Sequence, residues 1–166
     1  LYAPNKHSVA IGAEANYLEA RDYRQLLGNR EIEGLSKLNG HLSGYWDTGY
    51  YDYLAQLDVG RYIAGDDGGT ITMSRNFPNG WIVGGFFTLT NATFDDFGEG
   101  SFDKGLFLRI PFSSILPYET RYGLIEKVRP IQGDGGAKLA IQGRLYPLIS
   151  QYSKNKLNSS WGKIWR

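Results

Sequence analysis

The chain has 166 residues, with 18 Lys and Arg against 17 Asp and Glu, so its formal net charge at pH 7 is +1. A protein that binds nucleic acid would need a basic face, and this charge balance does not indicate one. We therefore expect no nucleic-acid partner. The absence of cysteine excludes disulfide frameworks, thiol nucleophiles and zinc sites made of cysteine. Glycine (22 residues) and aromatic residues (14%) are abundant, which favours many short strands joined by glycine turns.

No apolar run approaches the roughly 20 residues that a membrane-spanning helix needs, which excludes a helical membrane protein but not a barrel. The chain begins at Leu1, and no charged and apolar leader follows. We therefore expect either that a signal has been removed or that the chain is a fragment.

Hydrophobicity alternates with a period of two over nearly the whole chain, which indicates strands with one apolar face. In the first run, the odd-numbered Val9 and Ile11 lie on one face of the strand, and the even-numbered Glu14 and Asn16 lie on the other face. The dipeptide Asn79-Gly80 predicts a hairpin turn between two such runs. Strands are predicted, in chain order, over residues 8–22, 38–47, 51–60, 70–76, 81–90, 102–112, 119–129 and 136–146.

Helix is scarce in this interpretation, and only residues 22–27 and the tail from Leu148 onward have helical potential. We expect residues 1–150 to hold the β-strands and residues 151–166 to form a polar C-terminal tail.

Two all-β architectures fit the alternation. In a soluble sandwich the apolar faces of the strands are buried between two sheets. In a membrane barrel the apolar faces contact lipid and the polar faces line the lumen. Several runs reach ten or more residues, near the length of a tilted spanning strand. Aromatic side chains near the run ends are candidates for interfacial girdles: Tyr17, Trp46, Tyr51 and Trp81. Periodicity alone leaves both architectures open.

The sequence gives little support to catalysis. The acids Asp95, Asp96, Glu99 and Asp103 suggest a glycosidase or calcium site, but their spacing matches no known ligand loop. The glycine-rich segments 65–70 and 98–105 lack the Lys followed by Ser or Thr of a P-loop. The two histidines, His7 and His41, have no nearby residues in the spacing of a metal site or a catalytic triad. We expect no enzyme activity, no metal site and no cofactor.

Three arginines lie in apolar or aromatic runs: Arg61, Arg75 and Arg109. Because charges in a barrel avoid lipid, these side chains would point inward, where they would pair across strands or line a polar passage. The alternative is that they form ordinary cross-strand ion pairs, which contribute little to stability.

Three segments have a more specific pattern: VGRYIAGDDG, SRNFPNGW and FGEGSFDKG followed by RIPF, all within residues 58–112. In their order and spacing they resemble the YjbH family of Gram-negative outer-membrane proteins, which are associated with exopolysaccharide and capsule secretion. The segment RPIQGDGGAKL, residues 129–139, is similar to the C-terminal region of that family.

The resemblance implies an antiparallel outer-membrane β-barrel that assists export of an extracellular or capsular polysaccharide, as a passive conduit or a component of a secretion complex. Family members are several times longer, so this chain would contribute about eight strands to a larger closed barrel. The implied partners are the polysaccharide, outer-membrane lipid, and other export proteins or the remainder of the same polypeptide. The candidate lumen or polysaccharide contacts are Arg61, Asp66, Arg75, Asp103, Lys104 and Arg109.

Two alternatives remain open from the sequence. One is a soluble β-sandwich that binds glycans, and the other is a carbohydrate-active enzyme that uses the acids near Asp95.

Overall fold

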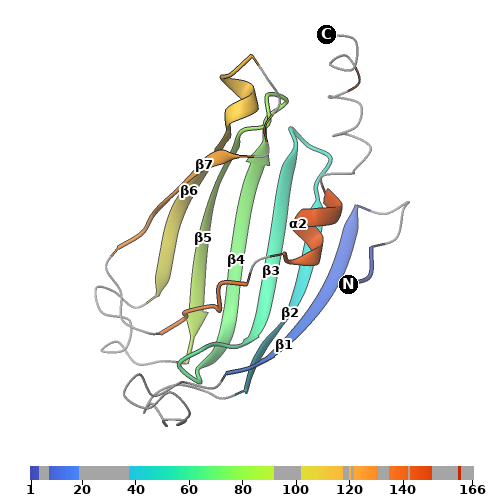
Figure 1. Cartoon of the computed structure of the whole chain (residues 1–166). Coiled ribbons are helices and arrows are strands. Elements are labelled where there is room, and N and C mark those ends of the chain that lie inside the picture. The colour runs from blue at the N-terminus through green and yellow to red at the C-terminus, as the bar shows by residue number, and fades with distance from the viewer. Residues whose placement is uncertain are drawn as a thin grey trace, which may run out of the picture.

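The structure is a computed structural model of the chain, and it describes residues 1–3, 8–18, 38–91, 102–117, 120, 122–130, 135–141, 143–150 and 161. Seven antiparallel strands form one sheet, in which spatial order follows chain order (Figure 1). The 3-10 helix η1 (Phe112–Ser114) follows the sixth strand, and helix α2 spans Leu145–Ser150. The strands are β1 Val9–Tyr17, β2 Leu38–Asp47, β3 Tyr53–Arg61, β4 Asp67–Asn76, β5 Ile82–Thr90, β6 Asp103–Pro111 and β7 Gly123–Val128.

The short turns are built from residues that tolerate a left-handed backbone. Gly80 has a φ of +89° in the turn between β4 and β5, where the Phe77 N–H donates a hydrogen bond to the Trp81 carbonyl (2.8 Å). The Asn79 side-chain oxygen accepts a further bond from the Trp81 N–H (3.1 Å). The hairpin predicted at Asn79-Gly80 is therefore confirmed.

One face of the sheet is apolar and exposed. The register places Ile71 of β4 opposite Leu57 of β3 and Phe87 of β5, so apolar residues of successive strands form continuous rows. We call this surface the apolar face. Twelve of its large apolar side chains are at least 39% exposed: Val9, Ile11, Leu42, Trp46, Leu57, Val59, Ile71, Met73, Val83, Phe87, Leu89 and Leu106.

The opposite surface, which we call the polar face, carries most of the buried polar side chains. Here Thr70 of β4 lies opposite Asp58 of β3 and Thr88 of β5. The buried hydrophobic residues among those described are only Ala10, Tyr45 and Tyr62. The buried polar residues are more numerous: Asn39, His41, Ser43, Asp58, Asp66, Thr70, Ser74, Thr88 and Asp103. The sheet thus buries its polar side and exposes its apolar side.

Residues 135–141 and 143–150, which we call the crossing segment, lie on the polar face. Figure 1 shows this segment passing in front of the sheet and ending in α2. The ring of Tyr146 in α2 stacks on Tyr45 of β2, with the centroids 3.8 Å apart. The crossing segment therefore covers the half of the polar face that β1, β2 and β3 form.

The sequence prediction of an eighth strand over residues 136–146 is wrong. Gly136 and Gly143 have φ angles of +70° and +78°, which a regular strand does not contain. The segment between them carries Lys138, which reaches carboxylates on the sheet below. The segment therefore attaches to the polar face through ion pairs and does not form a backbone ladder with the edge strand β7.

Other bounds differ by a few residues. β1 ends at Tyr17 rather than at residue 22, and β4 begins at Asp67 rather than at Thr70, because Gly68 pairs with Thr90 instead of turning. The predicted helix at 22–27 and nearly all of the predicted tail 151–166 lie outside the described residues.

The fold is all-β and antiparallel, as predicted, but within the described residues the sheet is open. β1 pairs with β2 and β7 pairs with β6, and no ladder joins β1 to β7. A sandwich would need a second sheet, and the described residues form one. In this part of the chain, no helix combines the length and apolarity required to cross a membrane.

Candidate functional site

The polar face and the crossing segment together form the largest cluster of charged side chains that the structure describes. Arg144 donates from Nε and Nη2 to the two carboxylate oxygens of Glu14 on β1 (3.0 and 3.1 Å). Lys138 Nζ lies 3.0 Å from Asp58 Oδ2 on β3 and 3.9 Å from Glu14 Oε1. Two cations of the crossing segment therefore meet two carboxylates of the sheet.

Asp58 is the most enclosed of these groups, with a side chain that is 4% exposed. It accepts hydrogen bonds from Ser43 Oγ on β2 (2.5 Å) and from Gln56 Nε2 on its own strand (2.8 Å). A buried carboxylate is tolerated only when it is paired and hydrogen-bonded. Ser43, Gln56 and Lys138 meet this requirement.

A row of hydroxyl groups crosses the middle of the polar face. The Tyr62 hydroxyl lies 2.6 Å from Thr70 Oγ1, which lies 2.8 Å from Thr88 Oγ1 on the next strand. The ring of Tyr62 also contacts the His41 ring edge-on, at 4.7 Å between centroids. Burial raises the pKa of the Tyr62 hydroxyl, so the hydroxyl stays protonated at neutral pH and can donate in this row.

The half of the polar face nearer β7 combines aromatic rings with glycines. Phe107 lies opposite Gly84, and Phe86 lies opposite Gly105, in adjacent positions of β5 and β6. A Cβ built on Gly105 would lie 2.7 Å from Phe86 Cε1, so each ring occupies the space above a glycine. Lys127 Nζ of β7 lies 4.2 Å from the Phe86 ring centroid.

Three of the residues predicted as contacts lie at or near the polar face. Asp66, in the turn after β3, accepts the Gly136 N–H through Oδ2 (2.9 Å) and so holds the start of the crossing segment. Asp103 lies opposite Thr88 and is 3.9 Å from Arg129 Nη1. Arg109 is on the same face and is exposed.

The other three predicted contacts lie on the apolar face, so the expected inward orientation is wrong for Arg61 and Arg75. Arg61 shares the parity of Val59 and makes a bidentate pair with Asp67 (3.0 and 2.9 Å). Lys104 lies opposite Phe87. All of these charges stand at strand ends, where solvent is within reach of the side chain.

Arg75 lies among aromatic rings at the end of β4. Its guanidinium carbon is 5.6 Å from the Tyr51 ring centroid, 5.7 Å from that of Tyr53 and 4.7 Å from that of Phe77. Arg75 Nε donates to the Tyr51 carbonyl (3.1 Å). The predicted aromatic position at Tyr51 is therefore part of a cluster of aromatic side chains around one cation.

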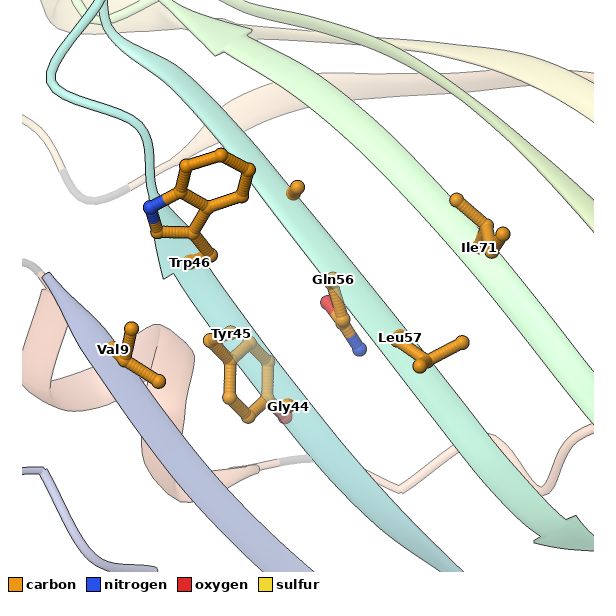
Figure 2. A pocket seen from close by; sticks show the side chains of 8 residues that line it. Val9, Gly44, Tyr45, Trp46, Gln56, Leu57 and Ile71 are labelled. Carbon is orange, nitrogen blue, oxygen red and sulfur yellow. The ribbon is translucent and has the colours of Figure 1, made fainter.

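The apolar face contains two shallow hollows at positions without large side chains. One, of about 310 Å³, lies over Gly44 and is bordered by Val9, Trp46, Leu57 and Ile71 (Figure 2). The other, of about 780 Å³, lies over Gly85 between Met73 and Leu106. The lining of the first is mostly apolar and includes no charged side chain, which suits hydrocarbon.

The carboxylates considered for catalysis, Asp95, Asp96 and Glu99, lie outside the described residues, as does His7. In the part that the structure describes, no group of three or more His, Asp or Glu side chains is placed to hold a metal ion. Sequence reasoning did not identify Lys138 as a site residue, because the period-two pattern of residues 136–146 assigned that segment to a strand.

The model of the YjbH family, described as "Exopolysaccharide biosynthesis protein YbjH", matches residues 1–151. The "Uncharacterized lipoprotein YjbH" of Escherichia coli (strain K12) is 35% identical over 156 residues, which is 93% of this chain and 22% of that protein. The chain thus spans about a fifth of the length of the curated relative that it matches. No solved structure matches the chain.

Proposed function

The chain belongs to the YjbH family of exopolysaccharide biosynthesis proteins, and from that premise we propose that it forms part of an outer-membrane β-barrel that assists export of an extracellular or capsular polysaccharide. The barrel acts as a passive conduit or as a component of a secretion complex. The resemblance found from the sequence is thereby confirmed at the level of the family.

The observation that carries the proposal is the inverted distribution of polarity across the sheet. Twelve large apolar side chains share one exposed face, whereas nine polar or charged residues are buried on or beside the other. A soluble sheet does the reverse, and a membrane barrel requires this arrangement because its outer surface contacts lipid and its interior contacts water.

The energy at stake is comparable with the stability of a whole domain. Full burial of a large apolar side chain contributes about 1.5–3 kcal/mol, so a half-exposed one loses about 1 kcal/mol. Twelve such residues lose on the order of 10 kcal/mol in water, against a typical free energy of unfolding of about 5–15 kcal/mol. Hydrocarbon around the apolar face removes this cost, and the hollows over Gly44 and Gly85 accept acyl chains.

Strand length and charge placement fit the same environment. β1 to β6 each contain 9 or 10 residues, which is the length that a tilted strand needs to cross a bilayer. The charges of Arg61, Arg75 and Lys104 on the apolar face are at strand ends, where they reach the headgroup region. Glu126 is the exception, and it lies on the edge strand β7.

The polar face offers the partners that a passing glycan needs. Thr70, Thr88 and Asp103 place hydroxyls and a carboxylate toward one end of the polar face, and Arg109 places a guanidinium six residues further along β6. Conduction requires contacts that are numerous and weak, since tight binding at one site would prevent exit. No single deep pocket on this face is needed for such a role.

The open sheet fits a barrel that further strands complete. A sheet in lipid cannot leave its edge groups unpaired, and both β1 and β7 are edges in the described residues. The E. coli relative contains more than four times the matched length, so such strands are available within one polypeptide. Its name describes it as a lipoprotein, which supports an envelope location for the present protein.

Two measurements on the full-length polypeptide test the proposal. After cell fractionation it should be recovered in the outer membrane, resist extraction by urea or carbonate, and require detergent for release. Deletion of its gene should lower extracellular polysaccharide, with restoration by the wild-type gene. A monodisperse protein in the soluble fraction, or unchanged polysaccharide after deletion, would contradict it.

A further inference from the structure

We propose that the crossing segment is a latched strap that closes the half of the polar face formed by β1, β2 and β3, and that release of Lys138 and Arg144 from Asp58 and Glu14 opens it. The inference rests on the proposed conduit, because it assigns a regulatory element to that same polar face. It adds that this half of the passage is closed in the state described by the structure.

The position of the segment gives it this effect. Gly136 is anchored through its N–H to Asp66, and the Ala137 carbonyl accepts a hydrogen bond from the Ile63 N–H (3.1 Å). From there the segment passes over β3 and β2 to the Tyr45–Tyr146 ring stack. A glycan moving along this half of the polar face would meet the backbone of residues 136–141.

The chemistry of attachment allows release. The anchors are two ion-paired cations, two hydrogen bonds to the turn after β3 and one ring stack. α2 itself has no buried residue, so lifting it uncovers mainly the buried ring of Tyr45, on which Tyr146 stacks. The groups left on the sheet, Glu14 and Asp58, are carboxylates that water solvates well. Unlatching therefore separates the ion pairs, the two hydrogen bonds and one aromatic stack.

The glycines at 136 and 143 supply the means of movement. Both have positive φ angles, and they flank residues 137–141. Such positions absorb backbone rotation more easily than residues with a Cβ. The segment between them can consequently swing as a unit when its cations are released.

Cysteine accessibility in the full-length polypeptide tests release directly. These 166 residues contribute no cysteine of their own, and labelling of the polypeptide without the added cysteine gives the background. Ser43→Cys places a nearly isosteric thiol under the strap, beside Asp58, and the weaker hydrogen bond from the thiol to Asp58 is common to all the proteins compared. Its reaction with a charged maleimide should be slow in the otherwise unchanged protein and about tenfold faster with Lys138→Gln and Arg144→Gln, because loss of one partner weakens a partly buried ion pair by at least that factor. Arg61→Gln breaks a bidentate pair on the apolar face and should leave the rate unchanged.

Ionic strength gives an independent readout without any change in the latch residues. An increase from about 0.01 to about 1 M shortens the Debye length from about 30 to about 3 Å, which weakens the ion pairs. The labelling rate of Ser43→Cys should then rise in the protein that keeps Lys138 and Arg144. It should change less in the protein that also carries Lys138→Gln and Arg144→Gln. Equal labelling rates in all these proteins and salts would overturn the latch.

A covalent lock tests the gating role. Ile63→Cys combined with Ala137→Cys joins two residues that already share a backbone hydrogen bond. Under oxidising conditions the pair should reduce polysaccharide export, and reductant should restore it, while each single variant exports normally. Normal export by the oxidised pair would overturn the strap as a gate. A different result would refute the proposed conduit, namely unchanged polysaccharide export after deletion of the gene.

Discussion

Phe107 and Gly84 occupy directly opposite positions of β6 and β5, and the Phe107 ring lies over the glycine. The adjacent pair repeats the arrangement in reverse, with the Phe86 ring over Gly105. Each ring gains contact with exposed backbone, and each glycine is shielded from water. Two strands are thus joined by reciprocal packing on a face that otherwise holds polar groups.

We expect Gly84→Ala to destabilise the protein, because its new Cβ would overlap the Phe107 ring and approach the Met73 carbonyl within 2.7 Å. Such overpacking costs about 1–3 kcal/mol. Gly44→Ala is the matched control, since the nearest atom to its Cβ is the Leu57 carbonyl oxygen at 4.0 Å. The measurement is thermal unfolding of the full-length polypeptide in detergent. Equal melting temperatures for the two variants would contradict the packing argument.

Adjacent residues on β4 test which face meets lipid. Ile71 is on the apolar face and Thr72 on the polar face. A lipid-facing Arg near the bilayer midplane costs about 2–4 kcal/mol, whereas a lumen-facing Arg does not pay this cost. Ile71→Arg should therefore lower the amount of protein assembled in the outer membrane, and Thr72→Arg should not. The amounts are compared by immunoblot of membrane fractions, and the opposite order would refute the assignment of faces.

The buried carboxylate Asp58 should matter more for stability than the exposed carboxylate Asp67. Asp58→Asn keeps the shape of the side chain but weakens its bonds with Lys138 and Ser43, and a hydrogen bond to a charged group contributes about 1.5–3 kcal/mol. Asp67→Asn removes an exposed pair with Arg61, which adds little. Denaturant unfolding of both variants provides the comparison. A larger loss for Asp67→Asn would show that the burial argument is wrong.

The alternation of the sequence was sufficient to predict the strands and their two faces. Seven of the eight predicted strands are present, because the parity of residues such as Leu57 and Asp58 is a local property that does not depend on distant partners. The Asn79-Gly80 turn was predictable for the same reason. The predicted strand bounds differ from the observed ones where glycines such as Gly68 continue a strand instead of ending it.

The crossing segment could not be predicted in this way. Residues 136–146 alternate like a strand, but Arg144 binds Glu14, which is 130 residues away in the sequence. Pairing at that separation depends on the folded sheet, and nothing in the local pattern distinguishes it from a strand that continues the ladder. The orientation of Arg75 was mispredicted because a guanidinium at a strand end can reach polar surroundings from the apolar face.

The arginines on the two faces offer a direct test of the export role. Arg109 is on the polar face, opposite Ile82, and its exposed guanidinium can contact a passing glycan. Arg75 is on the apolar face among the rings of Tyr51, Tyr53 and Phe77. Arg109→Gln should change the rate of polysaccharide export while the protein keeps its amount and melting temperature. Arg75→Gln should instead lower the melting temperature modestly, through loss of cation–π contacts, and leave export per molecule unchanged.

The two variants are compared by quantifying secreted polysaccharide relative to the amount of assembled protein. A charge that lines a passage acts on the rate of passage, whereas a charge at the membrane surface acts on the stability of the barrel wall. If Arg75→Gln alters export per molecule and Arg109→Gln does not, the polymer does not move along the polar face. The hydroxyl row from Tyr62 to Thr88 would then serve the stability of the sheet alone.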